Sequence, residues 1–144
     1  MTNANDISFL SQYDANALDY ELFNTYAFSL DQLIELAGLS CAHAIARSYD
    51  RGKILVISGP GNNGGDADGT SCDANKKMNI SHLDDSVFKN PSDMKNKFTL
   101  VVDALFGFNF KPPLRQPFDR IIEAVNKSAL PVAAIDIPSA VAGY

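Results

Sequence analysis

The chain has 144 residues, of which 46% are hydrophobic and 20% are charged, and this composition indicates a globular protein of one domain rather than a disordered chain. The formal net charge is −5, and no run rich in Lys and Arg is present, which argues against a surface that binds nucleic acid through phosphate contacts. The two cysteines form neither a disulfide framework nor a zinc-binding pattern, so a reducing compartment fits the sequence.

The N-terminal segment, MTNANDISFL, carries no targeting pattern. It lacks the basic start and apolar core of a signal peptide and the arginines of a mitochondrial transit peptide. No apolar run is long enough to span a membrane. We therefore expect a cytoplasmic protein without a membrane partner.

Two helices are expected in the first third of the chain. Ser11 followed by Asp14 is typical of a helix start. Ser29 and Gln32 form a capping-box pattern, and apolar residues then recur at helical spacing. The second helix is predicted at about residues 29–49.

Three short apolar runs, each rich in β-branched residues, are predicted to be strands buried on both faces, at 53–58, 100–103 and 132–136. Between the last two, the segment PFDRIIEAVNKS at 117–128 has proline in its first turn and an apolar stripe, so it is predicted to be a helix. Strand, helix and strand in this order form a βαβ unit. The fold class is therefore α/β with a parallel sheet.

The segment 67–85 follows the first predicted strand but has few large apolar residues and no apolar face. We expect a loop or a poorly packed helix here, with no strand beside 53–58. The sequence between them, Gly59 to Gly64, matches G-x-G-x-x-G. A dinucleotide fingerprint also needs a second strand that ends in an acidic residue, and Asp84 has no predicted strand before it. A turn-rich surface loop remains the alternative.

Polar residues follow all three predicted strands. Asn62, Asn63 and Asp66 lie in the glycine loop, Asp103 ends the second strand, and Asp136 ends the third. Ligands of open α/β sheets bind beyond the carboxyl ends of the strands, and glycines let backbone N–H groups approach a ligand closely. Each aspartate alone is commonly a cap or turn residue, but three converging strand ends favour a binding site.

The motifs GPGNNGGD, VVDALFGFNFK and AAIDIPS occur here in the order in which they occur in the YjeF N-terminal domain family. ELFNTYAFSLDQLIELAGLSCAHAIA also resembles the N-terminal helices of that family. The resemblance covers about residues 9–66 and 97–139. Members of this family are NAD(P)H-hydrate epimerases, known in animals also as apolipoprotein A-I-binding proteins.

The resemblance implies a Rossmann-like αβα sandwich with a parallel sheet. We expect one YjeF N-terminal-like domain over residues 1–144, with an internal gap near 67–96 and a truncated C-terminus. It also implies an isomerase that interconverts the R and S forms of hydrated NADH and NADPH in nicotinamide nucleotide repair. A homodimer and a mitochondrial location both occur in such a family.

The same resemblance assigns the site residues. The substrate-binding residues it implies are Asn62, Asn63, Gly64, Gly65, Asp66, Gly107, Phe108, Asn109, Phe110, Lys111, Pro112, Pro113 and Asp136. One potassium ion per subunit is implied at Asn63, Asp103 and Ser139, and oxygen ligands suit such a hard cation. Phe106, Phe108 and Phe110 are candidates to stack on a ligand ring, although for Phe106 core packing is at least as strong an expectation.

Asp136 is the expected catalytic residue. Epimerisation can proceed by loss and re-addition of water at the hydroxylated ring carbon, and a carboxyl group can serve as general acid and then as general base.

This chain departs from the family pattern in two places. The family has a helix where this chain continues with Ala67, and the family motif DIPSG is DIPSA here, with Ala140 in place of glycine. The alternative is therefore a weak or inactive YjeF N-terminal module that acts as a protein-binding or RNA-binding scaffold.

Overall fold

The computed structural model describes residues 10–59, 79–81, 88–111, 113–114 and 116–139, with the backbone alone at 79–81. The contacts within the chain divide it into two units, Met1–Leu33 and Ile34–Tyr144. Among the helices in these ranges, none combines the length and the apolar character needed to cross a membrane.

Helix α1, Gln12–Asn24, begins at a capping box. The backbone N–H of Asp14 donates to Ser11 Oγ at 3.2 Å, and the backbone N–H of Ser11 donates to the Asp14 carboxylate at 3.3 Å. Each of these bonds satisfies a donor that a helix terminus would otherwise leave unpaired. The predicted helix start is confirmed.

Helix α2, Leu30–Ser48, has the second predicted capping pair. The backbone N–H of Ser29 donates to Gln32 Oε1 at 2.9 Å, and the N–H of Gln32 donates to Ser29 Oγ at 3.2 Å. The helix ends before Asp50 and Gly52, within one residue of its predicted C-terminal boundary. From Ile34 onward, α2 belongs to the second unit.

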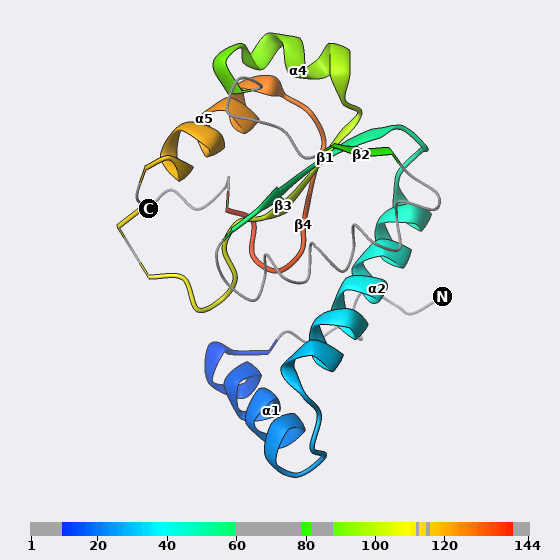
Figure 1. Ribbon diagram of the computed structural model, residues 1–144. Coiled ribbons are helices and arrows are strands. Elements are labelled where there is room, and N and C mark those ends of the chain that lie inside the picture. Colours follow the sequence, from blue (N-terminus) through cyan, green and yellow to red (C-terminus); the bar gives the residue numbers. More distant parts are fainter. Residues whose placement is uncertain (1–9, 60–78, 82–87, 112, 115, 140–144) are drawn as a thin grey trace. The chain divides into compact units, whose positions relative to one another are not determined.

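The second unit is built on a four-stranded sheet of order β2-β1-β3-β4 (Figure 1). Its strands and remaining helices, in chain order, are β1 Lys53–Ser58, β2 Asn79–Ser81, α4 Pro91–Lys97, β3 Leu100–Ala104, α5 Phe118–Ser128 and β4 Val132–Ala134. All three strand pairs are parallel. The predicted α/β class with a parallel sheet is confirmed.

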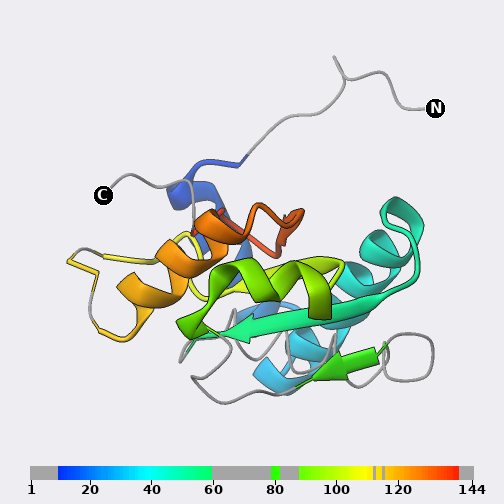
Figure 2. The ribbon, with the colours of Figure 1, turned by 90° about the horizontal axis from the view of Figure 1, so that it is seen from above.

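Helices cover both faces of this sheet (Figures 1 and 2). Met94 of α4 and Val125 of α5 are buried against one face in a core cluster, defined here as Leu55, Ile57, Met94, Phe98, Val101, Leu105 and Val125. Ile45 of α2 packs on the opposite face with Ile54, Leu100 and Val102. The second unit is thus an αβα sandwich, and β1 and β3 are apolar on both faces because both faces are covered.

Two elements correct the sequence prediction within 67–96. Strand β2 pairs in parallel with β1, so the expectation that no strand lies beside 53–58 is wrong. With three residues, β2 is too short for an apolar pattern to reveal it. Helix α4 was also not predicted; it has seven residues and a single buried side chain, Met94, although Pro91 in its first turn is a recognisable start signal.

The last strand is shorter than predicted. The sequence indicated a strand over 132–136, whereas β4 ends at Ala134. Ile135 still donates its N–H to Asp103 O at 3.0 Å, and the chain then bends away from the sheet. Asp136 therefore lies in the bend after the strand rather than within the strand.

Gly59 lies where the chain leaves β1, and there is no room for a side chain at this position. A Cβ at this position would collide with the backbone carbonyl of Leu105. Because backbone cannot rotate away as a side chain can, Gly59→Ala should lower the free energy of unfolding by about 1 to 3 kcal/mol. Chemical denaturation would measure this, with the exposed neighbour substitution Ser58→Ala as the control, expected to change stability by less than about 0.5 kcal/mol. Equal stability of the two variants would contradict the close approach.

Candidate functional site

The carboxyl ends of the parallel strands form one edge of the sheet. After β1 the chain places β2 on one side of it, whereas β3 lies on the other side, so the winding direction switches between β1 and β3. Gly59 donates its N–H to Ala104 O at 3.0 Å at this point. Ligands of open α/β sheets bind in the crevice at such a switch point. The predicted site residues begin here.

Asp103 is a buried carboxylate, 3% exposed, within the otherwise apolar strand β3. Its Oδ1 accepts from the backbone N–H of Leu105 at 3.2 Å, and its Oδ2 accepts from the N–H of Ser139 at 2.7 Å. Ser139 is 4% exposed, and its Oγ accepts from the backbone N–H of Phe106 at 3.3 Å. Asp103 thus connects the chain after β3 with the chain after β4.

The charge of Asp103 has no cationic side chain beside it in the part of the chain that the structure describes. A buried carboxylate is costly unless it is paired or neutralised. Its oxygens and the Ser139 hydroxyl each keep a lone pair beyond the bonds above. Oxygen ligands beside a buried carboxylate suit a hard cation.

The same described ranges contain no group of three or more His, Cys, Asp or Glu side chains placed to hold a metal ion. The groups here that could bind a cation are the Asp103 carboxylate oxygens and the Ser139 hydroxyl, which differ from the nitrogen and sulfur ligands that zinc prefers. The chemistry available at this edge is therefore that of oxygen ligands.

Asp136 lies beside Asp103 but differs in exposure. Residue 103 is paired with Ala134 in the sheet, and Asp136 follows two residues later on the exposed bend. Its Oδ2 accepts from the backbone N–H of Phe108 at 2.7 Å. The structure records no partner for Oδ1 among the described residues. One oxygen is therefore held by a backbone N–H, whereas none of the described residues bonds to the other.

A groove with a volume of about 470 Å³ runs between α2 and β4 and reaches Asp136. Its lining comes from the C-terminal half of α2 and from the β4 segment, and consists of Cys41, Ala44, Ile45, Ser48, Tyr49, Val132, Ala133, Ala134, Ile135, Asp136 and Pro138. This volume is within the range of small-molecule sites. Asp136 both lines this groove and bonds to the turn after β3, so it connects the groove with that turn.

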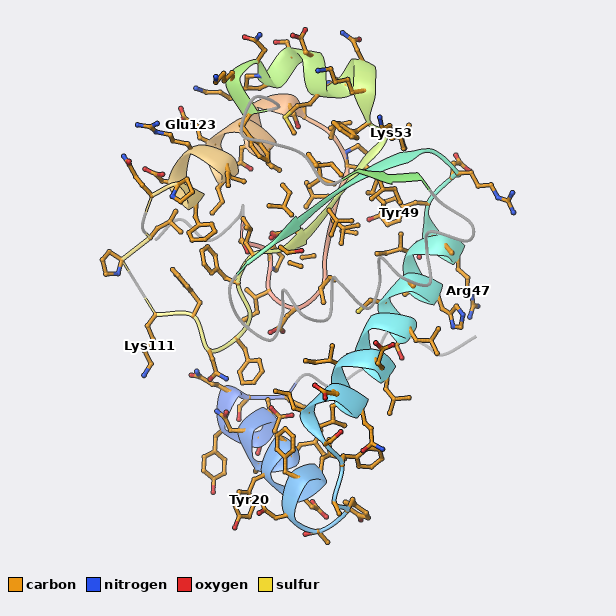
Figure 3. All side chains as sticks on the ribbon, in the orientation of Figure 1. Tyr20, Arg47, Tyr49, Lys53, Lys111 and Glu123 are labelled. Atoms are coloured by element: carbon orange, nitrogen blue, oxygen red, sulfur yellow. The ribbon has the colours of Figure 1, made fainter. Side chains whose placement is uncertain are left out.

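The structure brings together part of the predicted site. At one edge of the sheet, Asp103 is bonded to Ser139 and Asp136 is bonded to Phe108, which follows Gly107. Asn109 and Lys111 are exposed, and the Lys111 side chain extends away from the sheet (Figure 3). The predicted residues outside the described ranges are Asn62, Asn63, Gly64, Gly65, Asp66 and Pro112. Of the remaining predicted residues, Phe110 is half-buried and Pro113 is exposed.

The sequence did not indicate that Phe118, the first residue of α5, joins the aromatic residues near the predicted site. Its ring lies 5.2 Å from that of Phe106, edge to face, and Phe106 also packs against the core cluster. The expectation that Phe106 packs in the core is thereby confirmed. The aromatic spacing in the sequence identified Phe106 and Phe110, but no local pattern indicates that a ring twelve residues further on joins them.

The chain is similar in sequence to a known protein family and to several curated proteins. The family model "YjeF-related protein N-terminus" matches residues 30–81 and 69–143. The NAD(P)H-hydrate epimerase of Anopheles gambiae is 42% identical over 160 residues, which cover 92% of this chain and 70% of the mosquito protein. The NAD(P)H-hydrate epimerase of Aedes aegypti is 40% identical, with the same shares covered.

Among solved structures, the crystal structure of the yeast protein YNL200c is similar to this chain. The TM-score is 0.75 and the sequence identity 29%, over 92% of this chain and 71% of the yeast chain. The Rossmann-like arrangement inferred from the sequence thus agrees with both the sheet order and this neighbour.

Proposed function

The chain belongs to the family of YjeF-related proteins, N-terminal domain, and from this we propose that it is an NAD(P)H-hydrate epimerase. The observation that carries the proposal is the 40–42% identity to proteins of that name over 92% of the chain. The reaction is an isomerisation that interconverts the R and S forms of hydrated NADH and NADPH.

In the proposed mechanism, Asp136 acts as the acid and the base. In its protonated form, the carboxyl group gives its proton to the departing hydroxyl, which leaves the hydroxylated ring carbon as water, and the ring becomes cationic. The carboxylate then accepts a proton from a water molecule as its oxygen adds to the opposite face of the same carbon. The group ends in its starting state. This role is supported by the exposed position of Asp136 and by its unpartnered Oδ1 within the described region.

We propose that potassium is held by Asp103 and Ser139, together with Asn63 of the glycine loop. The support is the buried carboxylate of Asp103, which has no cationic partner among the described side chains. When bound, the ion would supply positive charge beside this carboxylate. Asp103 and Ser139 themselves hold the segments after β3 and β4 together by backbone hydrogen bonds.

The proposal includes contacts to the dinucleotide by residues 62–66 and 107–113. It also includes a homodimer and a cytoplasmic or mitochondrial location. The single domain with a shortened region near 67–96 is proposed as well. The family model matches the chain in two stretches that overlap at residues 69–81, and this supports a rearrangement there.

The test is a comparison of epimerisation rates. A purified single epimer of hydrated NADH, and separately of hydrated NADPH, would be incubated with and without the protein and resolved by chromatography. We expect the protein to accelerate the approach to equilibrium for both, after the spontaneous rate is subtracted. A rate equal to the spontaneous one, in a protein that unfolds cooperatively, would reject the activity and favour the non-catalytic scaffold.

A further inference from the structure

Three aromatic rings connect the turn after β3 to helix α5. We name Phe106, Phe110 and Phe118 the aromatic triplet. The Phe106 ring lies 4.3 Å from the Phe110 ring at an interplanar angle of 36°, and 5.2 Å from the Phe118 ring at 74°. Tilted and edge-to-face pairs at such distances are attractive beyond the area they bury.

The triplet is anchored at one end to the core of the second unit. Phe106 and Phe118 both pack against the core cluster between the sheet and α5. Phe118 is the first residue of α5, and it is half-buried. Phe106 follows Leu105, a member of that cluster. The triplet therefore links the turn after β3 to α5 and to the core cluster.

At its other end, the triplet closes the turn Gly107–Phe110. The backbone N–H of Phe110 donates to Gly107 O at 2.9 Å, so the ring pair Phe106–Phe110 lies across the base of a hydrogen-bonded turn. Phe108 is inside this turn. Its N–H direction is consequently fixed by the turn, and that N–H donates to Asp136 Oδ2 at 2.7 Å.

We propose that Phe118, acting through Phe106 and the turn, is a positioning residue for Asp136. Phe118 acts through the Phe106 ring, which it meets edge to face, and it holds the turn so that the Phe108 amide meets Asp136 Oδ2. The inference rests on the proposed epimerase function, in which Asp136 transfers the proton. Phe118 is not among the site residues predicted from the sequence, so the proposal gives a role to a further residue.

Loss of the Phe118 ring should weaken this orientation without removing the acid–base group. The pair energy of such rings corresponds to a lowering of kcat by about threefold to tenfold. KM should change little, because Phe118 lies on α5 and is not among the predicted substrate-binding residues. A misplaced catalytic group lowers the rate of the chemical step more than it lowers binding.

The experiment compares Phe118→Leu with Phe88→Leu. Phe88 is also half-buried against the core cluster, but it is in none of the ring pairs found within the described ranges, so it is a matched control for lost packing. Both variants would be assayed for kcat and KM, and the hydrogen exchange of the Phe108 amide would be measured by NMR. Asp136→Ala removes the acceptor and gives the exchange rate of the released amide.

In Phe118→Leu, we expect faster exchange at Phe108, a lower kcat and an unchanged KM, whereas Phe88→Leu should leave all three near wild type. Phe118→Tyr, which keeps the ring, should restore them. Unchanged exchange at Phe108 in Phe118→Leu, or an equal loss of kcat in both leucine variants, would overturn the proposal.

Failure of the proposed function is distinguishable, because exchange at Phe108 does not depend on activity. A wild-type protein without epimerase activity would reject the function and, with it, the catalytic meaning of the positioning, while the exchange result would still decide whether the triplet holds the amide. If Phe118→Leu does not fold, Phe110→Leu tests the same link through exchange alone, since Phe110 is outside the core cluster.

Discussion

Asp136→Asn should lower the rate of NAD(P)H-hydrate epimerisation by on the order of 10² to 10⁴-fold while the fold is kept. The amide oxygen of asparagine can still accept the N–H of Phe108, so the turn should keep its place. The amide cannot give or take the proton that water loss and re-addition require. Because Asp136 is exposed, the substitution leaves no buried group unpaired.

The measurement is the epimerisation rate after subtraction of the spontaneous rate, together with the midpoint of chemical denaturation. Asp50→Asn is the matched control, since Asp50 is exposed in the same unit and is far in sequence from the strand ends. It should show wild-type activity. An Asp136→Asn variant as fast as wild type would end the acid–base role, and the proton transfer would then have to be assigned to groups in the glycine loop.

The elements that the sequence predicted are those with a strong local signal. Strands β1 and β3 were predicted because both of their faces are apolar, and the structure buries both. Helices α1 and α2 were predicted from their capping residues, whose hydrogen bonds are present. In these cases the local sequence and the tertiary environment favour the same conformation.

The elements that it did not predict have little local signal. A three-residue strand such as β2 covers barely more than one alternation of side chains, so it depends on β1 for its pairing. Helix α4 has two turns and one buried residue, and tertiary packing rather than helix propensity decides whether so short a helix forms.

For the candidate site, the sequence predicted the acidic groups but not their partners. Asp103 and Asp136 were identifiable because they are polar residues at the ends of apolar strands. Their partners are backbone N–H groups of Leu105, Ser139 and Phe108, two of them 36 and 28 positions away. Every residue except proline has such a donor, so no residue type marks it, and only the folded topology brings it to the carboxylate.

The largest expected effect on stability concerns Asp103. In Asp103→Asn, the side chain keeps its volume but can accept a hydrogen bond through one atom only. One of the two backbone donors, Leu105 N–H or Ser139 N–H, then faces an NH₂ group in a buried place. An unsatisfied buried donor costs about 1 to 3 kcal/mol, so the free energy of unfolding should fall by that amount without potassium, and by more in potassium, where only wild type also gains from the ion.

The same substitution should remove the response to potassium. If the ion binds the folded protein at Asp103, wild type should gain about 1.4 kcal/mol at a potassium concentration tenfold above the dissociation constant, relative to choline at equal ionic strength. Asp103→Asn should gain nothing, because the ligand charge is gone. Denaturation curves of both proteins in potassium chloride and choline chloride measure the two increments.

Ser128→Ala separates loss of the ion from loss of stability. Ser128 is buried, 2% exposed, and its hydroxyl bonds to nearby backbone, donating to Val125 O and accepting from Leu130 N–H. This variant should be destabilised by a similar amount and yet keep the full potassium increment, because it leaves Asp103 and Ser139 in place. A potassium increment that survives in Asp103→Asn would move the ion away from this carboxylate, and no increment in wild type would remove the ion from the proposal.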